Sequence, residues 1–119
     1  MKNAALILAF VVAVFTSSGS ALAESKCDTL FSTYEVATCF NEEYLAADAA
    51  LNAAYKQRRA GIDETEQKLL RDAQRAWIKF RDAECLLAAD ASRGGSGAAI
   101  DGLRCQIKLT KRRTTDLGG

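Results

Sequence analysis

The stretch that decides the fold is LLRDAQRAWIKFRDAEC, residues 69–85. Its alanines, leucines and long charged side chains favour helix, and its apolar residues recur at three- and four-residue steps. At about 100° per residue, Gln74 and Arg81 lie within about 60° of Leu70 and Trp77, on the face expected to turn inward. The sequence therefore predicts a helix that buries a glutamine and an arginine beside the only tryptophan of the chain.

Local signals around this stretch predict three helices in a chain without proline. The first helix begins at Ser32, whose S-x-x-E pattern indicates a capping box, and it ends at Gly61, where a left-handed cap is expected. The second helix begins after Asp63, which has a glutamate three residues on, and runs to about Ala91. A glycine-rich turn follows, and Ser96 is the expected cap of the third helix.

Each predicted helix carries one apolar face. The residues expected to point inward are Val36, Phe40, Tyr44, Ala47, Leu51 and Tyr55, then Leu70, Ala73, Trp77, Phe80 and Leu87, then Ile100, Leu103, Ile107, Thr110, Thr114 and Leu117. The short turn near residue 61 makes the first two helices antiparallel neighbours. We therefore expect an all-α fold, a small disulfide-stapled bundle made of an antiparallel helical hairpin plus a third helix.

The first 23 residues have the form of a secretory signal peptide. A charged start is followed by an uncharged apolar run, residues 4–15, and by the cleavage pattern Ala21-Leu22-Ala23. The apolar run is too short to span a bilayer. We expect residues 1–23 to be removed and residues 24–119 to form a single domain, periplasmic or secreted and not membrane-spanning.

The charge of residues 24–119 argues against a nucleic-acid partner, because 15 basic side chains balance 15 acidic ones. The distribution is uneven, however. Residues 24–55 hold six acids and one base, and residues 103–119 hold five bases and one acid. Such asymmetry can steer a protein partner, and it can equally reflect helix faces that complement each other.

Four cysteines lie beyond the signal peptide, which indicates two disulfides in a small exported domain. Loop closure favours the short pairing, Cys27–Cys39 with Cys85–Cys105. The alternative is Cys39–Cys85 with Cys27–Cys105, because the hairpin sets Cys39 and Cys85 at similar distances from its turn.

A polar clamp is the expected partner set of the inward-facing Arg81. The hairpin brings Asp48 and Asn52 of the first helix opposite Trp77 and Gln74 of the second. A buried arginine requires a partner, and a carboxylate is the best available. We therefore predict that Asp48, Asn52, Gln74 and Arg81 form a structural clamp that fixes the register of the helices; a binding site in a groove between them is the alternative.

The sequence offers little for catalysis. It has no histidine, which removes the commonest general base and zinc ligand. Paired cysteines supply no thiol, and carboxylates one or two residues apart on a helix do not face each other. We expect no enzyme activity, no metal site and no cofactor.

Two blocks carry a family resemblance: ADAALNAAY, residues 47–55, and LRDAQRAWIKFRDAEC, residues 70–85, together with the spacing of the cysteines. The chain resembles the small secreted domains named after the LprI-type lysozyme inhibitor of mycobacteria, over nearly all of residues 24–119. Family members often carry TQ.EMN.C where this chain has TYEVATC, residues 33–39. The named member is a lipoprotein, whereas three residues separate the expected cleavage site from Cys27 here, so we expect no lipid anchor.

The resemblance implies stoichiometric binding to a lysozyme. Lysozymes of the animal type are basic and have a carboxylate-lined cleft, so an acidic face with a protruding basic turn suits them. The candidate partner-binding residues are Glu35, Glu42, Glu43, Arg93 and Ser96. The alternative is an envelope structural or interaction module with another partner and no effect on lysozyme.

Overall fold

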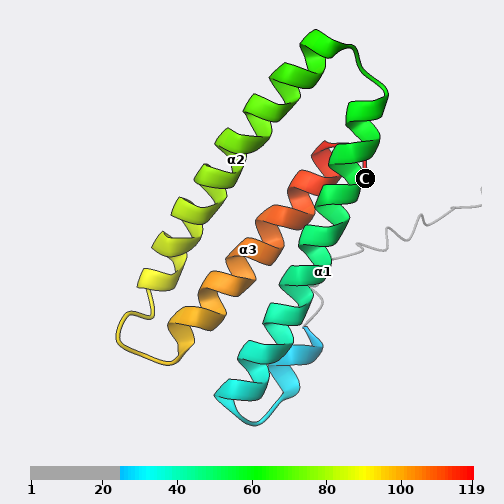
Figure 1. The fold of residues 1–119 in the computed structure, drawn as a ribbon. Coiled ribbons are helices and arrows are strands. Elements are labelled where there is room, and N and C mark those ends of the chain that lie inside the picture. Colours follow the sequence, from blue (N-terminus) through cyan, green and yellow to red (C-terminus); the bar gives the residue numbers. More distant parts are fainter. Residues whose placement is uncertain (1–24) are drawn as a thin grey trace, which may run out of the picture.

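A computed structural model describes residues 25–119 as an all-α fold. The short 3-10 helix η1, Lys26–Thr29, precedes three long helices: α1, Thr33–Ala60, α2, Glu64–Asp90, and α3, Gly97–Asp116 (Figure 1). This confirms the predicted fold class, a hairpin plus a third helix. The expected signal peptide, residues 1–23, lies outside the described residues.

Both predicted capping boxes are present. Ser32 accepts a hydrogen bond from the Glu35 backbone N–H, Asp63 accepts one from that of Glu66, and each glutamate side chain accepts one in return from its cap residue. These paired bonds satisfy N–H groups that have no partner inside the helix, so the two helices begin where the sequence predicts.

The two glycine-containing turns differ from expectation. Gly61 has a φ of −94°, so the left-handed cap predicted there is wrong. The next helix begins almost at once, and Gln67 Nε2 donates to the carbonyls of Arg59 and Ile62, at 3.1 Å each, which satisfies backbone groups that a left-handed cap would otherwise serve. Ser96 occupies the cap position of α3 but its side chain makes no capping bond, while Gly94 supplies the left-handed residue of that turn with a φ of 82°.

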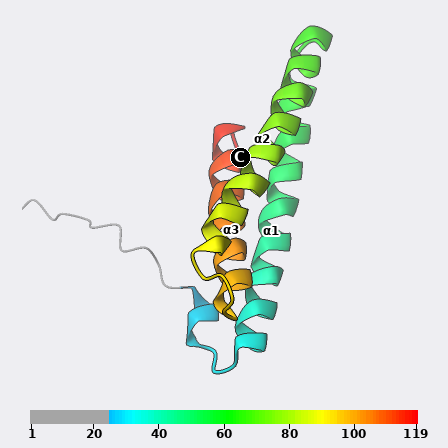
Figure 2. The same cartoon turned by 90° about the vertical axis from the view of Figure 1, so that its left-hand side faces the viewer.

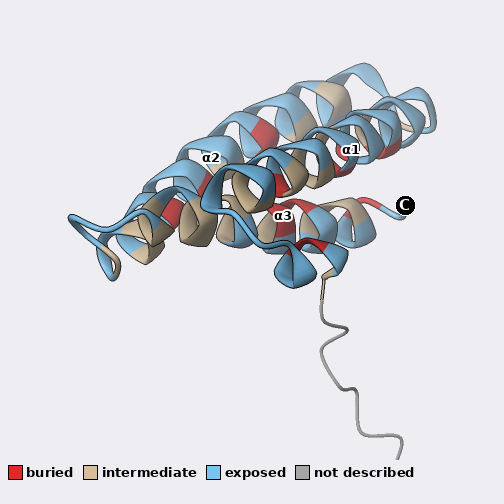
Figure 3. Ribbon diagram, turned by 90° about the horizontal axis from the view of Figure 1, so that it is seen from below, coloured by how far each residue is buried: buried red, intermediate tan, exposed pale blue. Residues whose placement is uncertain are grey.

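The third helix joins the two arms of the hairpin. α1 and α2 run antiparallel, and α3 makes the close backbone contacts with each of them. Seen from below, α3 lies on one side of the pair formed by α1 and α2 and runs roughly along them (Figure 3). In the side view, η1 lies at the end of the bundle where α1 begins (Figure 2). The hairpin is therefore held together largely through α3.

The core consists of two small clusters along this junction. One holds Cys27, Phe40 and Ile107, and the other holds Leu51, Ala54 and Leu117 with Tyr55, Leu70 and Trp77 packed against it. All residues of the predicted apolar faces of α1 and α3 are buried or half-buried. None of the described helices is long and apolar enough to cross a membrane.

The predicted inward face of α2 is partly wrong. Ala73, Phe80 and Leu87 are exposed, whereas the buried residues of this helix are Gln74, Arg81 and Cys85. Cys85 is bonded to Cys105 of α3, and this bond sets the rotation of α2 about its axis. Phe80 and Leu87 lie roughly 100–120° from Arg81 around the helix, so they turn to solvent when Arg81 turns inward.

Candidate functional site

Arg81 lies at the centre of the bundle and is only 6 % exposed. Its Nε donates to Asp82 Oδ1 at 2.9 Å, and its terminal nitrogens reach Asp82 Oδ1 at 2.8 Å and Thr110 Oγ1 at 3.5 Å. Asp48 Oδ1 of α1 is 3.9 Å away. The guanidinium thus contacts all three helices, and its nearest charge partner is its chain neighbour rather than Asp48.

Aromatic rings enclose the same guanidinium. Its carbon lies 5.7 Å from the centre of the Tyr44 ring and 5.3 Å from that of Trp77. The negative face of an aromatic ring attracts a cation, more strongly when water is excluded. This explains why an arginine stands beside the only tryptophan.

The other two predicted clamp residues, Asn52 and Gln74, bind different partners. Asn52 Nδ2 donates to Asp48 Oδ2 at 3.3 Å and so belongs to the Arg81 group. Gln74 does not meet Asn52; its Oε1 accepts from Arg113 Nε of α3 at 3.0 Å, and Arg113 also lies over the Trp77 ring. The structure therefore forms two polar links. One joins Arg81 to Asp82, Thr110 and Asp48, the last of which also binds Asn52, and the other joins Gln74 to Arg113.

Sequence reasoning missed the partners that α3 supplies. Thr110 is fully buried. Like Gln74 and Arg81 it is a polar residue on a mostly apolar face, where Thr114 is the other polar member. Arg113, one turn further along α3, carried no comparable signal. Every buried side-chain nitrogen and oxygen of residues 25–119 has at least one hydrogen-bond partner within the fold.

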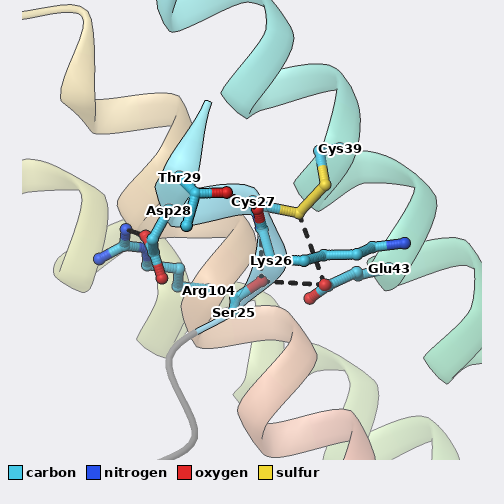
Figure 4. The surroundings of a disulfide bond; sticks show 8 residues. All are labelled: Ser25, Lys26, Cys27, Asp28, Thr29, Cys39, Glu43 and Arg104. Carbon is cyan, nitrogen blue, oxygen red and sulfur yellow. Dashed lines mark hydrogen bonds and ion pairs between the residues drawn. A yellow bond between two sulfur atoms is a disulfide. The ribbon is translucent and has the colours of Figure 1, made fainter. Parts of the chain in front are cut away.

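Disulfides join Cys27 to Cys39 and Cys85 to Cys105, the first of the two pairings considered above. The former ties η1 to α1, and its surroundings add further links (Figure 4). Ser25 Oγ donates to Glu43 Oε1 at 2.9 Å, and Asp28 forms an ion pair with Arg104 of α3. The segment that leads into α1 is therefore fixed to two helices.

The same disulfide brings Cys27, Cys39 and Glu43 close enough to suggest a metal site, with their candidate ligand atoms within 4.8 Å of one another. Both sulfurs are bonded to each other, however, and a metal requires free thiolate. The 3.5 Å approach of Glu43 Oε1 to Cys27 Sγ is likewise a packing contact, because a disulfide sulfur carries no proton.

The segment after η1 and the first turn of α1 together form an exposed aromatic tip, which we define as Leu30, Phe31 and Tyr34. Phe31 is 103 % exposed and Tyr34 80 % exposed. A shallow hollow beside them is lined by Lys26, Leu30, Tyr34, Glu35, Thr38, Cys39 and Glu42. No periodic signal marks Phe31 in the sequence, so this feature was not predicted.

Of the three predicted acidic residues, Glu35 and Glu42 line this hollow, whereas Glu43 lies beside the Cys27–Cys39 disulfide. The Glu35 carboxylate accepts hydrogen bonds from Ser32, through N at 3.1 Å and Oγ at 2.8 Å. Glu43 accepts from Ser25. Glu42 is exposed and lines the hollow, and within residues 25–119 its carboxylate has no hydrogen-bond or ion-pair partner.

The predicted basic turn lies at the same end of the bundle as the start of α1 (Figure 1). Arg93 is exposed and pairs with Asp90 at 2.8 Å, and Ser96 is exposed. The structure thus places all five predicted partner-binding residues toward one end, on two separate segments.

One carboxyl group remote from this end has a shifted pKa. Lys68 Nζ donates to Asp72 Oδ2 at 2.8 Å on the exposed surface of α2. This hydrogen bond, with the lysine charge, lowers the pKa of the Asp72 carboxyl below its ordinary value. An exposed pair of this kind on one helix is an ordinary surface contact.

The fold and its two disulfides define the class. The protein is a small all-α domain in which one disulfide fixes the N-terminal segment to α1 and the other joins the helices on either side of the glycine turn. The chain belongs to the family described as lysozyme inhibitor LprI, whose family model matches residues 24–117. This confirms the resemblance predicted from the two sequence blocks.

Two relatives illustrate the family. The chain is 32 % identical over 130 aligned positions to an uncharacterized protein of Rhizobium meliloti (strain 1021), covering 98 % of this chain and 94 % of the relative. It is 36 % identical over 99 positions to the uncharacterized protein YecT of Escherichia coli (strain K12), covering 69 % of this chain and 60 % of YecT. No solved structure matches the chain.

Proposed function

We propose that this protein is exported, to the periplasm or beyond, and that it inhibits a lysozyme by stoichiometric binding without turnover. Family membership supports the partner class. Two disulfides suit an oxidising compartment, and the expected signal peptide ends where the family match begins.

The observation that carries the proposal on this chain is the rigid presentation of the aromatic tip. Phe31 is fully exposed, yet it is flanked by a segment that the Cys27–Cys39 disulfide ties to α1 and by the capped start of that helix. A backbone segment tied at both ends before binding loses less conformational freedom on association than a free loop does. Aromatic residues are also frequent among those that dominate binding energy.

Charge complements this apolar contact. Glu42 lies free beside the hollow, and a basic lysozyme presents the opposite sign. The turn that holds the exposed Arg93 lies at the same end of the bundle as the start of α1, where this residue can face the carboxylates that line a lysozyme cleft. In this arrangement the tip supplies affinity, and the charges supply orientation and association rate.

The test is a lysis assay with purified oxidised protein, residues 24–119, titrated against a c-type lysozyme on a cell-wall suspension. We expect saturable inhibition near one-to-one stoichiometry, weaker at high salt. Phe31→Ala should raise the half-inhibiting concentration about 10- to 100-fold, the loss typical of a central aromatic contact.

Leu45→Ala is the matched control, since Leu45 is an exposed apolar residue of α1 that does not line the hollow. Its inhibition should equal that of the parent protein. No inhibition at a large molar excess of the protein, at low or at high salt concentration, would remove lysozyme as the target. The protein would then be an envelope interaction module, and a pull-down from envelope extract would identify its partner.

A further inference from the structure

The exposed side of α2 carries a continuous apolar stripe. It consists of Leu69, Ala73, Ala76, Phe80, Ala83 and Leu87, all of them exposed. The exposed fractions of the three large members are 62 % for Leu69, 55 % for Phe80 and 68 % for Leu87. Their steps of four, three, four, three and four residues keep all six within about 40° of one line along the helix.

This stripe inverts the usual pattern of a surface helix. Such a helix ordinarily buries its apolar side and turns its charged side to water. Here α2 buries Gln74 and Arg81 and exposes Phe80 and Leu87. Alternating steps of three and four residues form the seam of paired helices, and a large exposed apolar patch on a soluble domain marks an interaction surface.

We propose that the stripe is a two-fold interface with a second copy of this chain, in which the two α2 helices pair antiparallel. A two-fold interface uses the same patch on both copies, so the patch must be complementary to itself. The order of large and small residues along the stripe makes it complementary to itself. Antiparallel pairing sets Phe80 against Ala76 of the second copy, Leu69 against its Leu87, and Ala73 against its Ala83.

The sizes along this seam fit together. Each phenyl ring lies opposite an alanine, which leaves room for it, and the small residues permit close approach of the helix axes. The charge nearest to the two-fold axis is that of Lys79, and its long side chain can turn into water. The stripe does not include the aromatic tip, so this interface leaves the surface of the proposed function free.

The extent of the seam sets the expected affinity. Eighteen residue steps span about 27 Å, and a helix is about 10 Å wide. Two such faces cover about 540 Å² in projection, below the roughly 1,200 Å² of standard specific interfaces and in the range of weak, transient ones. A dimer with a dissociation constant of about 1–100 µM is therefore expected.

Sedimentation equilibrium of the oxidised protein between about 1 and 500 µM, a range that spans the expected affinity, tests the pairing. The parent protein should pass from monomer to dimer, and Phe80→Glu should raise the dissociation constant about 30-fold or more, as loss of a central contact does. Ile78→Glu is the control. Ile78 is a large hydrophobic of the same helix, 39 % exposed, on the opposite side from the stripe, so its replacement should leave association unchanged.

A size exchange tests the antiparallel register itself. Ala76→Phe alone should weaken the dimer, because it sets phenyl against phenyl. The double variant Ala76→Phe/Phe80→Ala should restore it, because large again meets small with the roles reversed. Both positions are exposed in the single chain, so circular dichroism should show unchanged helix. A parent protein that stays monomeric throughout, a dimer insensitive to Phe80→Glu, or a failed rescue would each overturn the proposal.

Discussion

Replacing Cys85 and Cys105 together by alanine is expected to lower the free energy of unfolding by about 3 kcal/mol. The bond closes a loop between residues 20 positions apart, and loss of that constraint raises the entropy of the unfolded chain. The bond also joins α2 to α3, the helix that holds the two arms of the hairpin together. Denaturant unfolding followed by far-ultraviolet circular dichroism gives this difference directly.

The Cys27→Ala/Cys39→Ala variant is the matched control. Its loop is also short, with a separation of 12, so the entropic contribution is similar. That bond ties down a terminal segment, however, which can detach while the three helices stay packed. We expect faster amide exchange in η1, but not in α2 or α3. A loss below about 1 kcal/mol for the Cys85 and Cys105 variant, well under the entropic expectation, would contradict the argument.

Local signals predicted the helices well because the physics behind them is local. A capping box needs only residues within one turn, and both boxes formed where the sequence placed them. The apolar faces of α1 and α3 followed from spacing alone, since each of these helices has one dominant stripe. The left-handed cap at Gly61 failed because a residue six positions on, Gln67, satisfies the backbone instead.

The rotation of α2 depended on tertiary contacts. Two apolar sets lie on this helix, one around Leu70 and Trp77 and one around Phe80 and Leu87, and helical periodicity favours neither. The disulfide to α3 and the partners of Arg81 select the first. The separation of Gln74 from Asn52 has the same origin, because α3 brings Arg113 to Gln74. The exposed Phe31 has no signal in a single sequence, since its importance arises from the disulfide-held loop around it.

Arg81→Ala should lower the free energy of unfolding by about 3 kcal/mol. The substitution removes two cation–π contacts, to Tyr44 and Trp77, each of about 0.5–2 kcal/mol, and the packing of the buried arginine stem. It also leaves the Thr110 hydroxyl without its arginine partner in a fully buried position. The two carboxylates contribute little to this loss, because Asp48 and Asp82 keep 40 % and 49 % of their side-chain surface in water.

Two further variants separate the stability contributed by the aromatic rings and the arginine stem from that contributed by the carboxylates. Arg81→Met keeps the length and apolar stem but removes the charge, so it should cost less than Arg81→Ala. Asp48→Asn should change stability by no more than about 0.5 kcal/mol, as expected for a partly exposed pair at 3.9 Å. Urea unfolding of the three proteins measures all of these values. If Asp48→Asn proved as damaging as Arg81→Ala, the arginine would be held by its carboxylate rather than by the aromatic rings, and the proposed clamp would be an ion pair after all.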